Sequence, residues 1–323
     1  MLLLPLNRPN AMSAKLEKQI TSHLLMVRPA HFGFNEETAG NNAFQKNDGA
    51  FTPAQIRRKA ITEFDNFVHL LRAAGMQVTV IEDTDYPMKT DAIFPNNWVT
   101  FHENGTVITY PMFSPARRLE RRDDVLQKLG KEYHIDNRVH LETSESEEKF
   151  LEGTGSMILD RPNHLVYACI SPRTDVGLLE EFCQITGFEK VAFTAVDGIG
   201  TPIYHTNVMM ALGETFVVIC LDTVKNPTER EALLQKFEET NKEVIEISLS
   251  QMLSFAGNML QVQNRSGEPI LVMSEQAYKS LENNQIRLLN KHTNLLYAPI
   301  YTIEKYGGGS ARCMMAEVFL REK

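Results

Sequence analysis

The chain has 323 residues, of which 43% are hydrophobic and 23% are charged, an ordinary mixture for a folded globular protein. Its formal net charge of −8 argues against a nucleic-acid-binding protein, because that function needs a basic surface. The sequence has no apolar run near the ~20 residues of a membrane span, so no membrane partner is expected. The length exceeds that of a typical domain of about 100–200 residues, which leaves either two domains or one large architecture.

The N-terminus and the cysteines bear on location. The apolar residues 1–6 are too few for the core of a signal peptide, which needs about 7–15. We therefore interpret residues 1–22 as an N-terminal extension that is expected to be disordered. Four cysteines are too few for a disulfide framework in a chain of this length, and none forms a CxxC pair that would indicate zinc. We expect a cytoplasmic protein without a metal ion.

Five runs of the sequence have apolar residues at helical spacing. Three of them begin with Ser, Thr or Asn directly before Pro. This pair is typical of a helix start, because the side chain caps a free N–H group and Pro loses no hydrogen bond there. The predicted helices begin at Thr52-Pro53, Ser114-Pro115 (running to about Leu129), Pro172-Arg173-Thr174, Asn226-Pro227 and Ser274 (running through Leu281).

Each predicted helix lies between two short runs that are rich in β-branched and aromatic residues and therefore favour strands. The strands predicted before the helices are Leu24–Val27, Thr106–Tyr110, Leu165–Ile170, Phe216–Leu221 and Ile270–Met273. The strands predicted after the helices are Val78–Ile81, Tyr133–Ile135, Val191–Phe193, Val244–Ile247 and Leu295–Ala298. This alternation of strands and helices indicates an α/β fold.

A polar residue stands just ahead of an apolar run at five places, spaced 55, 53, 53 and 55 residues apart. These residues are Asn97, Glu152, His205, Asn258 and Cys313. A fixed period predicts a repeated unit, here strand, strand, helix, strand in about 54 residues. If five such units surround an axis, the five polar residues meet in one central cavity. The alternative is that they are five unrelated turn residues, which is a natural interpretation of Asn258 in its Ala-Gly-Asn turn.

Cys313, His205 and Glu152 are the parts of a nucleophilic catalyst. A thiolate attacks, an imidazole moves protons, and a carboxylate holds the imidazole in position. Cys313 follows a turn of three glycines and opens an apolar run, so we expect it to be held rigidly and yet approached closely. The alternatives are a buried structural thiol, a structural histidine and a solvated turn acid.

The sequence resembles the guanidine-modifying superfamily, also called penteins, over about residues 24–321. The resemblance lies in the order of three motifs, Leu151-Glu152-Gly153, His205-Thr206-Asn207 and Gly309-Ser310-Ala311-Arg312-Cys313. Residues 26–39, 94–98 and 151–156 look most like the citrulline-utilisation hydrolase group. The resemblance implies a single catalytic domain, residues 23–323, folded as a five-bladed α/β propeller of ββαβ units around a central active-site cavity. It also implies a Cys313, His205 and Glu152 catalytic set that needs no metal or organic cofactor.

Two positions depart from that family, whose members acting on free guanidines usually have Asp where Asn97 and Asn207 stand. A carboxylate balances the charge of a guanidinium, whereas the neutral amide of Asn both donates and accepts hydrogen bonds. Such an amide pair suits a neutral ureido group, whose C=O needs a donor and whose NH2 needs an acceptor. We therefore expect a hydrolase that converts citrulline to ornithine, ammonia and carbon dioxide through a thioester at Cys313.

Further substrate contacts are indicated less sharply. Arg117 or Arg118 is a candidate for binding the carboxylate of an amino-acid substrate, although the first turn of a helix is commonly solvated. Asn42 lies 55 residues before Asn97 and is another candidate. Residues 33–51 form a long irregular segment, which we interpret either as a lid over the cavity or as a passive surface loop.

Two other kinds of function stay open. One is a different enzyme of the same superfamily: an arginine or methylarginine deiminase, a dihydrolase or an amidinotransferase. The other is a non-catalytic binding protein with the same propeller, and the presence of Cys313, His205 and Glu152 counts against it. Any of these enzymes, like the citrulline hydrolase, would have a small amino-acid substrate as its partner. A homo-oligomer is compatible with the sequence.

Overall fold

The structure, a computed structural model, describes residues 17–40, 42 and 44–323. Most of the predicted N-terminal extension, residues 1–22, lies outside this range. Within the described part of it, the side chain of Gln19 donates a hydrogen bond to the carbonyl of Leu159 at 2.9 Å, and Ile20 is buried. In the described residues, no helix is both long and apolar enough to cross a membrane.

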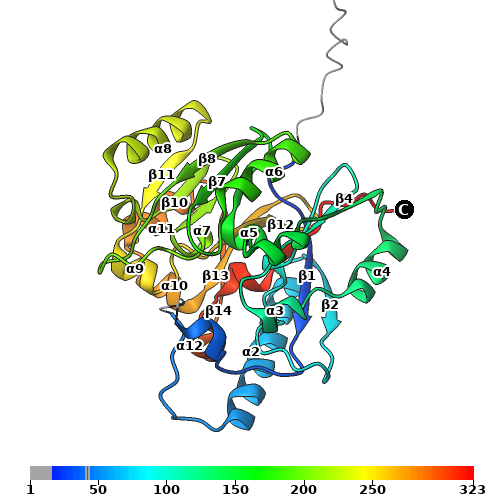
Figure 1. Cartoon of the computed structure of the whole chain (residues 1–323). Coiled ribbons are helices and arrows are strands. Elements are labelled where there is room, and N and C mark those ends of the chain that lie inside the picture. Colours follow the sequence, from blue (N-terminus) through cyan, green and yellow to red (C-terminus); the bar gives the residue numbers. More distant parts are fainter. Residues whose placement is uncertain (1–16, 41, 43) are drawn as a thin grey trace, which may run out of the picture.

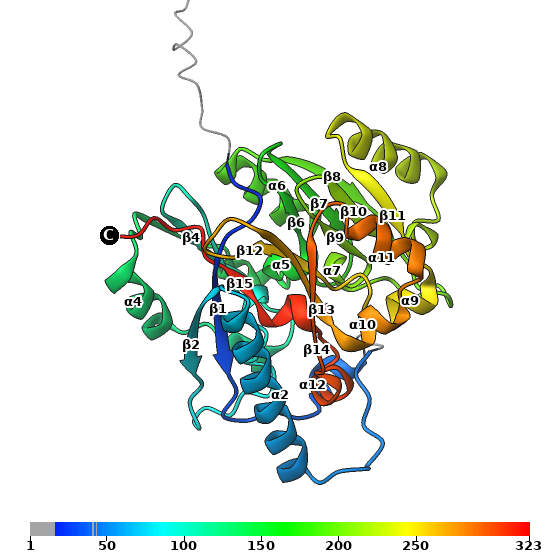
Figure 2. The ribbon, with the colours of Figure 1, turned by 180° about the vertical axis from the view of Figure 1, so that it is seen from behind.

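Five sheets of three strands each organise the described residues (Figures 1 and 2). In four of these sheets the strands follow one another along the chain: β3 (Val99–Phe101), β4 (Thr106–Thr109) and β5 (Asn137–His140); β6 (Ile158–Asp160), β7 (Leu165–Cys169) and β8 (Glu189–Phe193); β9 (Met210–Leu212), β10 (Phe216–Ile219) and β11 (Glu243–Glu246); β12 (Leu260–Gln263), β13 (Pro269–Ser274) and β14 (Asn294–Ala298). The middle strand pairs antiparallel with the first and parallel with the third.

The fifth sheet joins the two ends of the chain. Its middle strand, β1 (His23–Arg28), pairs parallel with β2 (Gln77–Glu82) and antiparallel with β15 (Ala316–Glu317) near the C-terminus. The last strand therefore supplies the first strand of the opening unit, which gives this sheet the same pairing pattern as the other four. These sheets confirm the predicted five ββαβ units.

The parallel strands of each sheet are joined through helices, because a parallel pair needs a crossover connection between its strands. Figure 1 shows α2, α4 and α8 at the periphery of the molecule. The helices are α1 (Glu36–Ala39), α2 (Pro53–Ala73), α3 (Pro115–Arg118), α4 (Asp123–Glu132), α5 (Gly153–Ser156), α6 (Val176–Thr186), α7 (Thr206–Met209), α8 (Pro227–Glu239), α9 (Leu249–Leu253), α10 (Glu275–Ser280), α11 (Asn283–Leu289) and α12 (Tyr301–Gly307). The 3-10 turns are η1 (Pro95–Asn97), η2 (Leu141–Glu147), η3 (Leu221–Thr223) and η4 (Ala311–Met314).

The predicted helix from Ser114 to Leu129 is wrong in its continuity. It is two helices, α3 and α4, separated at residues 119–122. Arg122 has extended backbone angles, and two acidic residues occupy the first turn of α4, which is where negative charge favours a helix N-terminus. The strand predicted at Tyr133–Ile135 is also wrong, because Tyr133 still donates its N–H to the carbonyl of Leu129 and the strand begins four residues later.

The helix predicted from Pro172 begins instead at Val176. The side chain of Asp175 accepts a hydrogen bond from the N–H of Leu178 at 2.9 Å and caps the helix. Arg173 lies before this cap, and its carbonyl oxygen accepts hydrogen bonds from Ser156 Oγ and from the N–H of Glu152. The backbone ahead of the helix is therefore used to hold the turn that carries Glu152 in the same unit.

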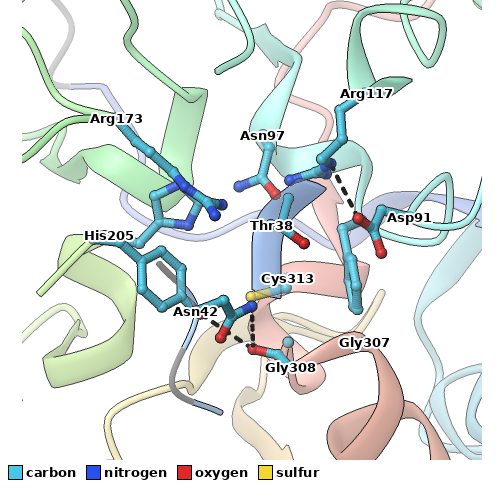
Figure 3. A pocket seen from close by; sticks show the side chains of 13 residues that line it. Thr38, Asn42, Asp91, Asn97, Arg117, Arg173, His205, Gly307, Gly308 and Cys313 are labelled. Carbon is cyan, nitrogen blue, oxygen red and sulfur yellow. Dashed lines mark hydrogen bonds and ion pairs between the residues drawn. The ribbon is translucent and has the colours of Figure 1, made fainter. Parts of the chain in front are cut away.

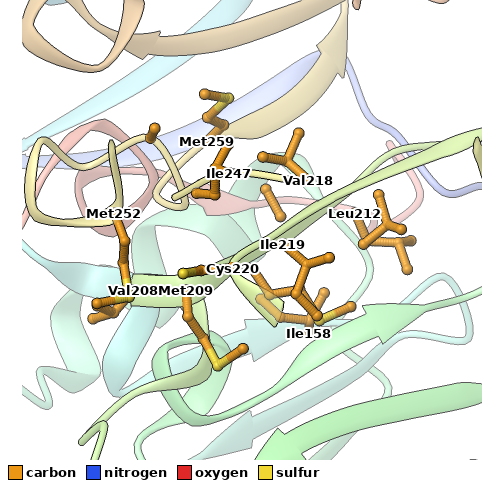
Figure 4. Close-up of a cluster of buried hydrophobic side chains, with 14 of the residues drawn as sticks. Ile158, Val208, Met209, Leu212, Val218, Ile219, Cys220, Ile247, Met252 and Met259 are labelled. Carbon is orange, nitrogen blue, oxygen red and sulfur yellow. The ribbon is translucent and has the colours of Figure 1, made fainter. Parts of the chain in front are cut away.

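Apolar side chains pack between the sheets and their helices. Figure 4 shows a cluster that combines Ile158 of β6, Val218 and Ile219 of β10, and Met252 and Met259 from the next unit. Because this core is shared between units, the positions of neighbouring sheets are fixed relative to each other by close packing. The same packing fixes the loops at the strand ends.

Candidate active site

The five periodic polar residues occupy equivalent places just before the first strand of each unit. Asn97 ends η1 and Cys313 lies in η4. Glu152 and His205 are the residues directly before the short helices α5 and α7, and Asn258 precedes β12. Contacts join η1 to η4, η1 to α5, and α5 to α7, so these turns meet although they are far apart in the sequence.

A pocket opens where these turns meet. Figure 3 shows its lining residues as sticks: Thr38, Asn42, Asp91, Phe94, Asn97, Arg117, Arg173, Tyr204, His205, Gly307, Gly308, Gly309 and Cys313. Cys313 lies near Gly308 in this view, with Arg173 and His205 to one side and Arg117 to the other. The thiol of the candidate nucleophile therefore faces a cavity that also contains the candidate histidine.

His205 is held by Glu152. The ring nitrogen Nε2 lies 2.7 Å from Glu152 Oε2, and both side chains are buried. The second carboxylate oxygen, Oε1, accepts the N–H of Phe113 at 2.9 Å. These two contacts fix the carboxylate, and the carboxylate in turn fixes the orientation of the imidazole.

The two groups keep different charges. Burial alone would raise the pKa of Glu152, but the Arg173 guanidinium, the hydrogen bond to His205 and Arg117 together lower that pKa well below its usual range. Glu152 is therefore a carboxylate. Burial lowers the pKa of His205 to about 4, although Glu152 acts in the opposite direction. At neutral pH the imidazole is therefore neutral and able to accept a proton.

The glycine-rich turn before Cys313 explains how the thiol can be approached. Gly308 ends helix α12 with φ of +64°, a conformation that other residues rarely adopt, and a Cβ there would contact the side chain of Asn42. Its carbonyl oxygen accepts hydrogen bonds from Tyr204 Oη at 3.1 Å and Asn42 Nδ2 at 3.5 Å. Asn42, which was predicted to contact the substrate, thus lines the pocket and also holds this turn in place.

The opposite end of the pocket is ionic. Arg117 forms a bidentate ion pair with Glu120 at 2.9 Å for both contacts, and its Nε lies 3.8 Å from Asp91 Oδ2. Its Nη1 lies 3.8 Å from Glu152 Oε2, and Arg173 Nη1 lies 3.6 Å from the same oxygen. The guanidinium of Arg173 also stands over the ring of the pocket residue Tyr204 at 4.8 Å. Two arginines and their carboxylates therefore surround the space above Cys313.

Arg118, the other predicted arginine, does not line the pocket. Its Nε donates to the carbonyl of Met112 at 3.1 Å and lies 3.4 Å from Glu145 Oε2. Arg117 and Arg118 are adjacent in α3, so their side chains leave the helix about 100° apart and only one of them can face the cavity.

Asp91 and Arg173 were missed by the sequence analysis. Asp91 stands six residues before Asn97, and its Oδ2 accepts Asn35 Nδ2 at 2.7 Å, while its Oδ1 has no hydrogen-bond partner in the described residues. Burial raises the pKa of Asp91, and Arg117 and Asn35 oppose this effect. A signal for Arg173 was present, since it follows an apolar strand directly, but it was assigned to a helix start.

The amides of Asn97 and Asn207 have free hydrogen-bonding atoms in the described structure. Asn97 Nδ2 has no acceptor and Asn207 Oδ1 has no donor, although both side chains are buried. Asn207 Nδ2 points to Cys313 Sγ at 3.5 Å. A Cβ at Gly155 would overlap both Asn97 Nδ2 and the ring of His205, so the glycine allows this amide to lie beside the imidazole.

The segment 33–51 contributes to one wall of the pocket through Thr38 and Asn42. Glu37 of this segment accepts hydrogen bonds from Ser114 Oγ at 2.5 Å and from the N–H of Ala116 at 3.0 Å. Residues 41 and 43 lie outside the described residues. Whether the segment opens as a lid stays a prediction. In the described part of the chain, no group of three or more His, Cys, Asp or Glu side chains is placed to hold a metal ion.

Solved structures with a similar fold belong to arginine-metabolising enzymes. The apo structure of ArgZ, an arginine dihydrolase from the ornithine-ammonia cycle in cyanobacteria, has a TM-score of 0.71 at 14% identity over 92% of this chain. The chain spans about 40% of full-length ArgZ, but it covers 97% of a structure of the ArgZ N-terminal domain bound to substrate, with a TM-score of 0.70 at 14% identity. A dimethylarginine dimethylaminohydrolase has a TM-score of 0.64 at 13% identity, over 92% of this chain and 99% of its own.

These structural similarities show the fold, a pentein propeller. Comparison of the sequence with curated proteins gives no match. The family is given by a sequence model for N,N dimethylarginine dimethylhydrolase, eukaryotic, which matches residues 28–320 and thus most of the chain, including all five turns of the pocket. The chain therefore belongs to the N,N-dimethylarginine dimethylhydrolase family of the guanidine-modifying enzymes.

Proposed function

We propose that this protein is a cysteine-dependent hydrolase of the ureido group of citrulline or of a closely related amino acid. The carrying observation is a pair of free amide atoms at the site, where Asn97 lines the pocket and Asn207 donates its Nδ2 to Cys313 Sγ. Asn97 Nδ2 is an unpaired donor and Asn207 Oδ1 is an unpaired acceptor. A ureido group presents one C=O and one NH2, so it would satisfy both atoms. A buried polar atom left without a partner costs about 1–3 kcal/mol, which favours a substrate that fits both.

The charges in the pocket support a neutral reacting group. Glu152 is committed to His205 and the two arginines, and Glu120 to Arg117. A guanidinium placed over Cys313 would be a third cation near Arg117 and Arg173. The two asparagines with free atoms, Asn97 and Asn207, are neutral and would not balance its charge. Like charges in a pocket of low dielectric repel strongly. A neutral ureido carbon avoids this cost.

The ionic end suits the amino-acid part of the substrate. Arg117 and Arg173 both line the pocket, and a guanidinium binds a carboxylate with directed N–H donors. Asp91 Oδ1 has no hydrogen-bond partner in the described residues and would accept a hydrogen bond from the α-ammonium group. A zwitterionic amino acid would therefore place its charged groups at this end and its side-chain ureido group at Cys313.

The reaction then has two steps. The thiolate of Cys313 attacks the ureido carbon, and the C–N bond to ornithine breaks. His205 gives the departing nitrogen the proton taken from the thiol. The enzyme is left with a carbamoyl group on sulfur. In the second step His205 takes a proton from water as the oxygen adds to the carbamoyl carbon, and it returns that proton as the C–S bond breaks. The carbamic acid so released decomposes to ammonia and carbon dioxide.

His205 is suited to both steps because its imidazole is neutral at neutral pH. Its pKa of about 4 lets it accept a proton, and Glu152 stabilises the imidazolium that forms. The site residues proposed here act without a metal or organic cofactor. A cytoplasmic location is part of the proposal, supported by the four cysteines Cys169, Cys183, Cys220 and Cys313, all of which are free.

The second candidate function is hydrolysis of a guanidino group, as in a methylarginine hydrolase. The family match favours it, and so does the unpaired Oδ1 of Asp91, which could accept an N–H from a cationic group. The two candidates share Cys313, His205 and Glu152 and differ in the group that Asn97 and Asn207 recognise.

Product analysis by mass spectrometry separates these candidates. The protein is incubated with citrulline, arginine, dimethylarginine and N-succinylarginine in turn, with Cys313→Ala as the control. We expect ornithine from citrulline and none with the variant. Citrulline from arginine or from dimethylarginine, without turnover of citrulline itself, would replace the ureido proposal by the guanidino one.

A further inference from the structure

The sequence left two interpretations of Asn258, a cavity residue or a simple turn residue. In the structure its side chain contacts the sulfur of Cys313. Asn258 Nδ2 lies 3.3 Å from Cys313 Sγ and 2.9 Å from the carbonyl oxygen of Asn207, so the amide nitrogen is directed by two acceptors. Asn258 Oδ1 lies 3.6 Å from the same sulfur. The residue is 2% exposed, so water does not compete for these contacts.

A second amide reaches the sulfur from another unit. Asn207 Nδ2 lies 3.5 Å from Cys313 Sγ. Within the described residues, these two amides are the side chains with polar atoms at hydrogen-bonding distance from the sulfur. His205 shares the pocket, but its Nε2 is engaged by Glu152, and its ring is neutral at neutral pH. The recorded contacts of the sulfur are therefore with neutral amides and not with an imidazolium.

We propose that Asn258 is a positioning residue that holds the sulfur of Cys313 and, together with Asn207, stabilises its thiolate by amide N–H···S hydrogen bonds. This inference rests on the proposed role of Cys313 as nucleophile, but not on the identity of the substrate. The thiolate is the reacting form of cysteine, and donors directed at it favour ionisation without adding a cation to the pocket.

The amide of Asn258 serves both protonation states. In the thiol form, Sγ–H donates to Oδ1, while in the thiolate form Nδ2 donates to sulfur. The side chain needs no rotation between the two states, because Nδ2 is fixed by the carbonyl of Asn207. A neutral amide adds no charge next to the reacting group of the substrate. A lysine or arginine at this position would repel a cationic substrate, and it would compete with the other donors for the oxygen of a ureido group.

The test measures the ionisation of Cys313 directly. The rate of iodoacetamide alkylation at Cys313 is followed against pH by peptide mass spectrometry, which separates it from Cys169, Cys183 and Cys220. In Asn258→Ala we expect about a tenfold slower alkylation at a given pH below the plateau of the profile, as suits one lost hydrogen bond to a charged group. In Asn258→Asp we expect a larger loss of rate, because an anion of nearly the same size replaces the donor.

Charged and titratable groups that share the pocket with the thiol are Asp91, Arg117, Arg173, Tyr204 and His205, and all are unchanged in these variants. Asn96→Ala is the matched control. Asn96 is also a buried asparagine at a strand end, but its amide donates to Thr154 Oγ1 at 3.3 Å. We expect that variant to keep the wild-type alkylation profile.

A purely structural role for Asn258 predicts a different pattern. Thermal stability would fall in Asn258→Ala while the alkylation profile of the folded protein stayed in place. Profiles of Asn258→Ala and Asn258→Asp that match the wild type would overturn the proposal. Because alkylation needs no substrate, a failure to hydrolyse citrulline would leave this result independent of the proposed function.

Discussion

The two ends of the pocket differ in charge: one has neutral amides and the other has ion pairs. The buried amides of Asn207 and Asn258 contact Cys313 Sγ, and the amide of Asn97 lines the same pocket. Arg117 and Arg173, which also line this pocket, stand among carboxylates. Neutral amides distinguish groups by the placing of donors and acceptors, whereas ion pairs recognise charge. The difference agrees with the proposed substrate, which is zwitterionic at one end and uncharged at the other.

The largest effect is expected at Glu152, where the ionic end meets His205. Glu152→Gln should lower kcat by roughly 10²–10⁴-fold, because a neutral amide cannot stabilise the imidazolium of His205. It would also leave Arg117 and Arg173 short of a buried counter-charge. Steady-state kinetics on the folded variant measure the effect.

Glu145→Gln is a close control for this experiment. Glu145 accepts the N–H of Met112 at 2.8 Å, much as Glu152 accepts that of Phe113, and it pairs with Arg121 outside the pocket. It should lose some stability and keep its kcat. Equal losses of kcat in both variants would mean that Glu152 acts only through the fold.

The next effect concerns the carboxylate of the substrate. Arg173→Lys should raise KM by roughly 10–100-fold with a smaller change in kcat, because an ammonium keeps the charge but loses the planar fork of donors. Arg118→Lys, in which the changed side chain lies outside the pocket, should leave KM as it is. A KM that responds to Arg118 rather than to Arg173 would reverse the assignment of the ionic end.

The neutral end can be converted to resemble the ionic one. Asn97→Asp places a carboxylate beside the reacting carbon, so the ratio of kcat/KM for citrulline to that for arginine should fall by about tenfold or more. Asn96→Asp is the control for a general charge effect. It adds the same charge one residue earlier, where the native amide donates a hydrogen bond to Thr154 Oγ1. If the two variants change the ratio equally, the recognition is not specific to Asn97.

The smallest effect lies beneath the neutral end. Glu304 accepts Ser310 Oγ at 2.6 Å under the glycine turn, and burial raises its pKa to about 7. Between about pH 4.5 and 7 the unfolded chain ionises this group before the folded one does, so folding stability is lost as pH rises through that window.

Glu304→Gln should therefore stabilise the protein at pH 8 by roughly 1–3 kcal/mol and give no gain near pH 4.5. Thermal unfolding of both proteins at the two pH values checks the sign. A loss of stability at pH 8 would mean that the ionised carboxylate has a partner in solution.

Much of the fold follows from local signals. The Thr52-Pro53 and Asn226-Pro227 starts were confirmed, because the capping side chains there contact only their own helix. The fixed spacing identified the turns that meet at the pocket, because every unit repeats one ββαβ pattern. The start predicted at Pro172 was wrong because of contacts made in the folded structure. The carbonyl oxygen of Arg173 accepts hydrogen bonds from Glu152 and Ser156 of the same unit and does not take part in the helix.

The site divides in the same way. Glu152, His205 and Cys313 could be predicted since each follows the period. Asp91 could not, because it reaches the pocket from outside the periodic turns, and Arg173 was assigned to a helix start. Their side chains are directed by contacts with Asn35 and Tyr204. The choice between Arg117 and Arg118 depended on which face of a four-residue helix points inward, which needs the packed structure.

The most direct test of the ureido proposal is the intact mass of the protein after acid quenching during turnover. With citrulline, the account predicts a carbamoyl group on Cys313, since ornithine has already departed, and no adduct in Cys313→Ala. With arginine it predicts no adduct. A larger adduct from arginine that retains the amino-acid chain, with none from citrulline, would contradict the account and identify the neutral end as a guanidinium site.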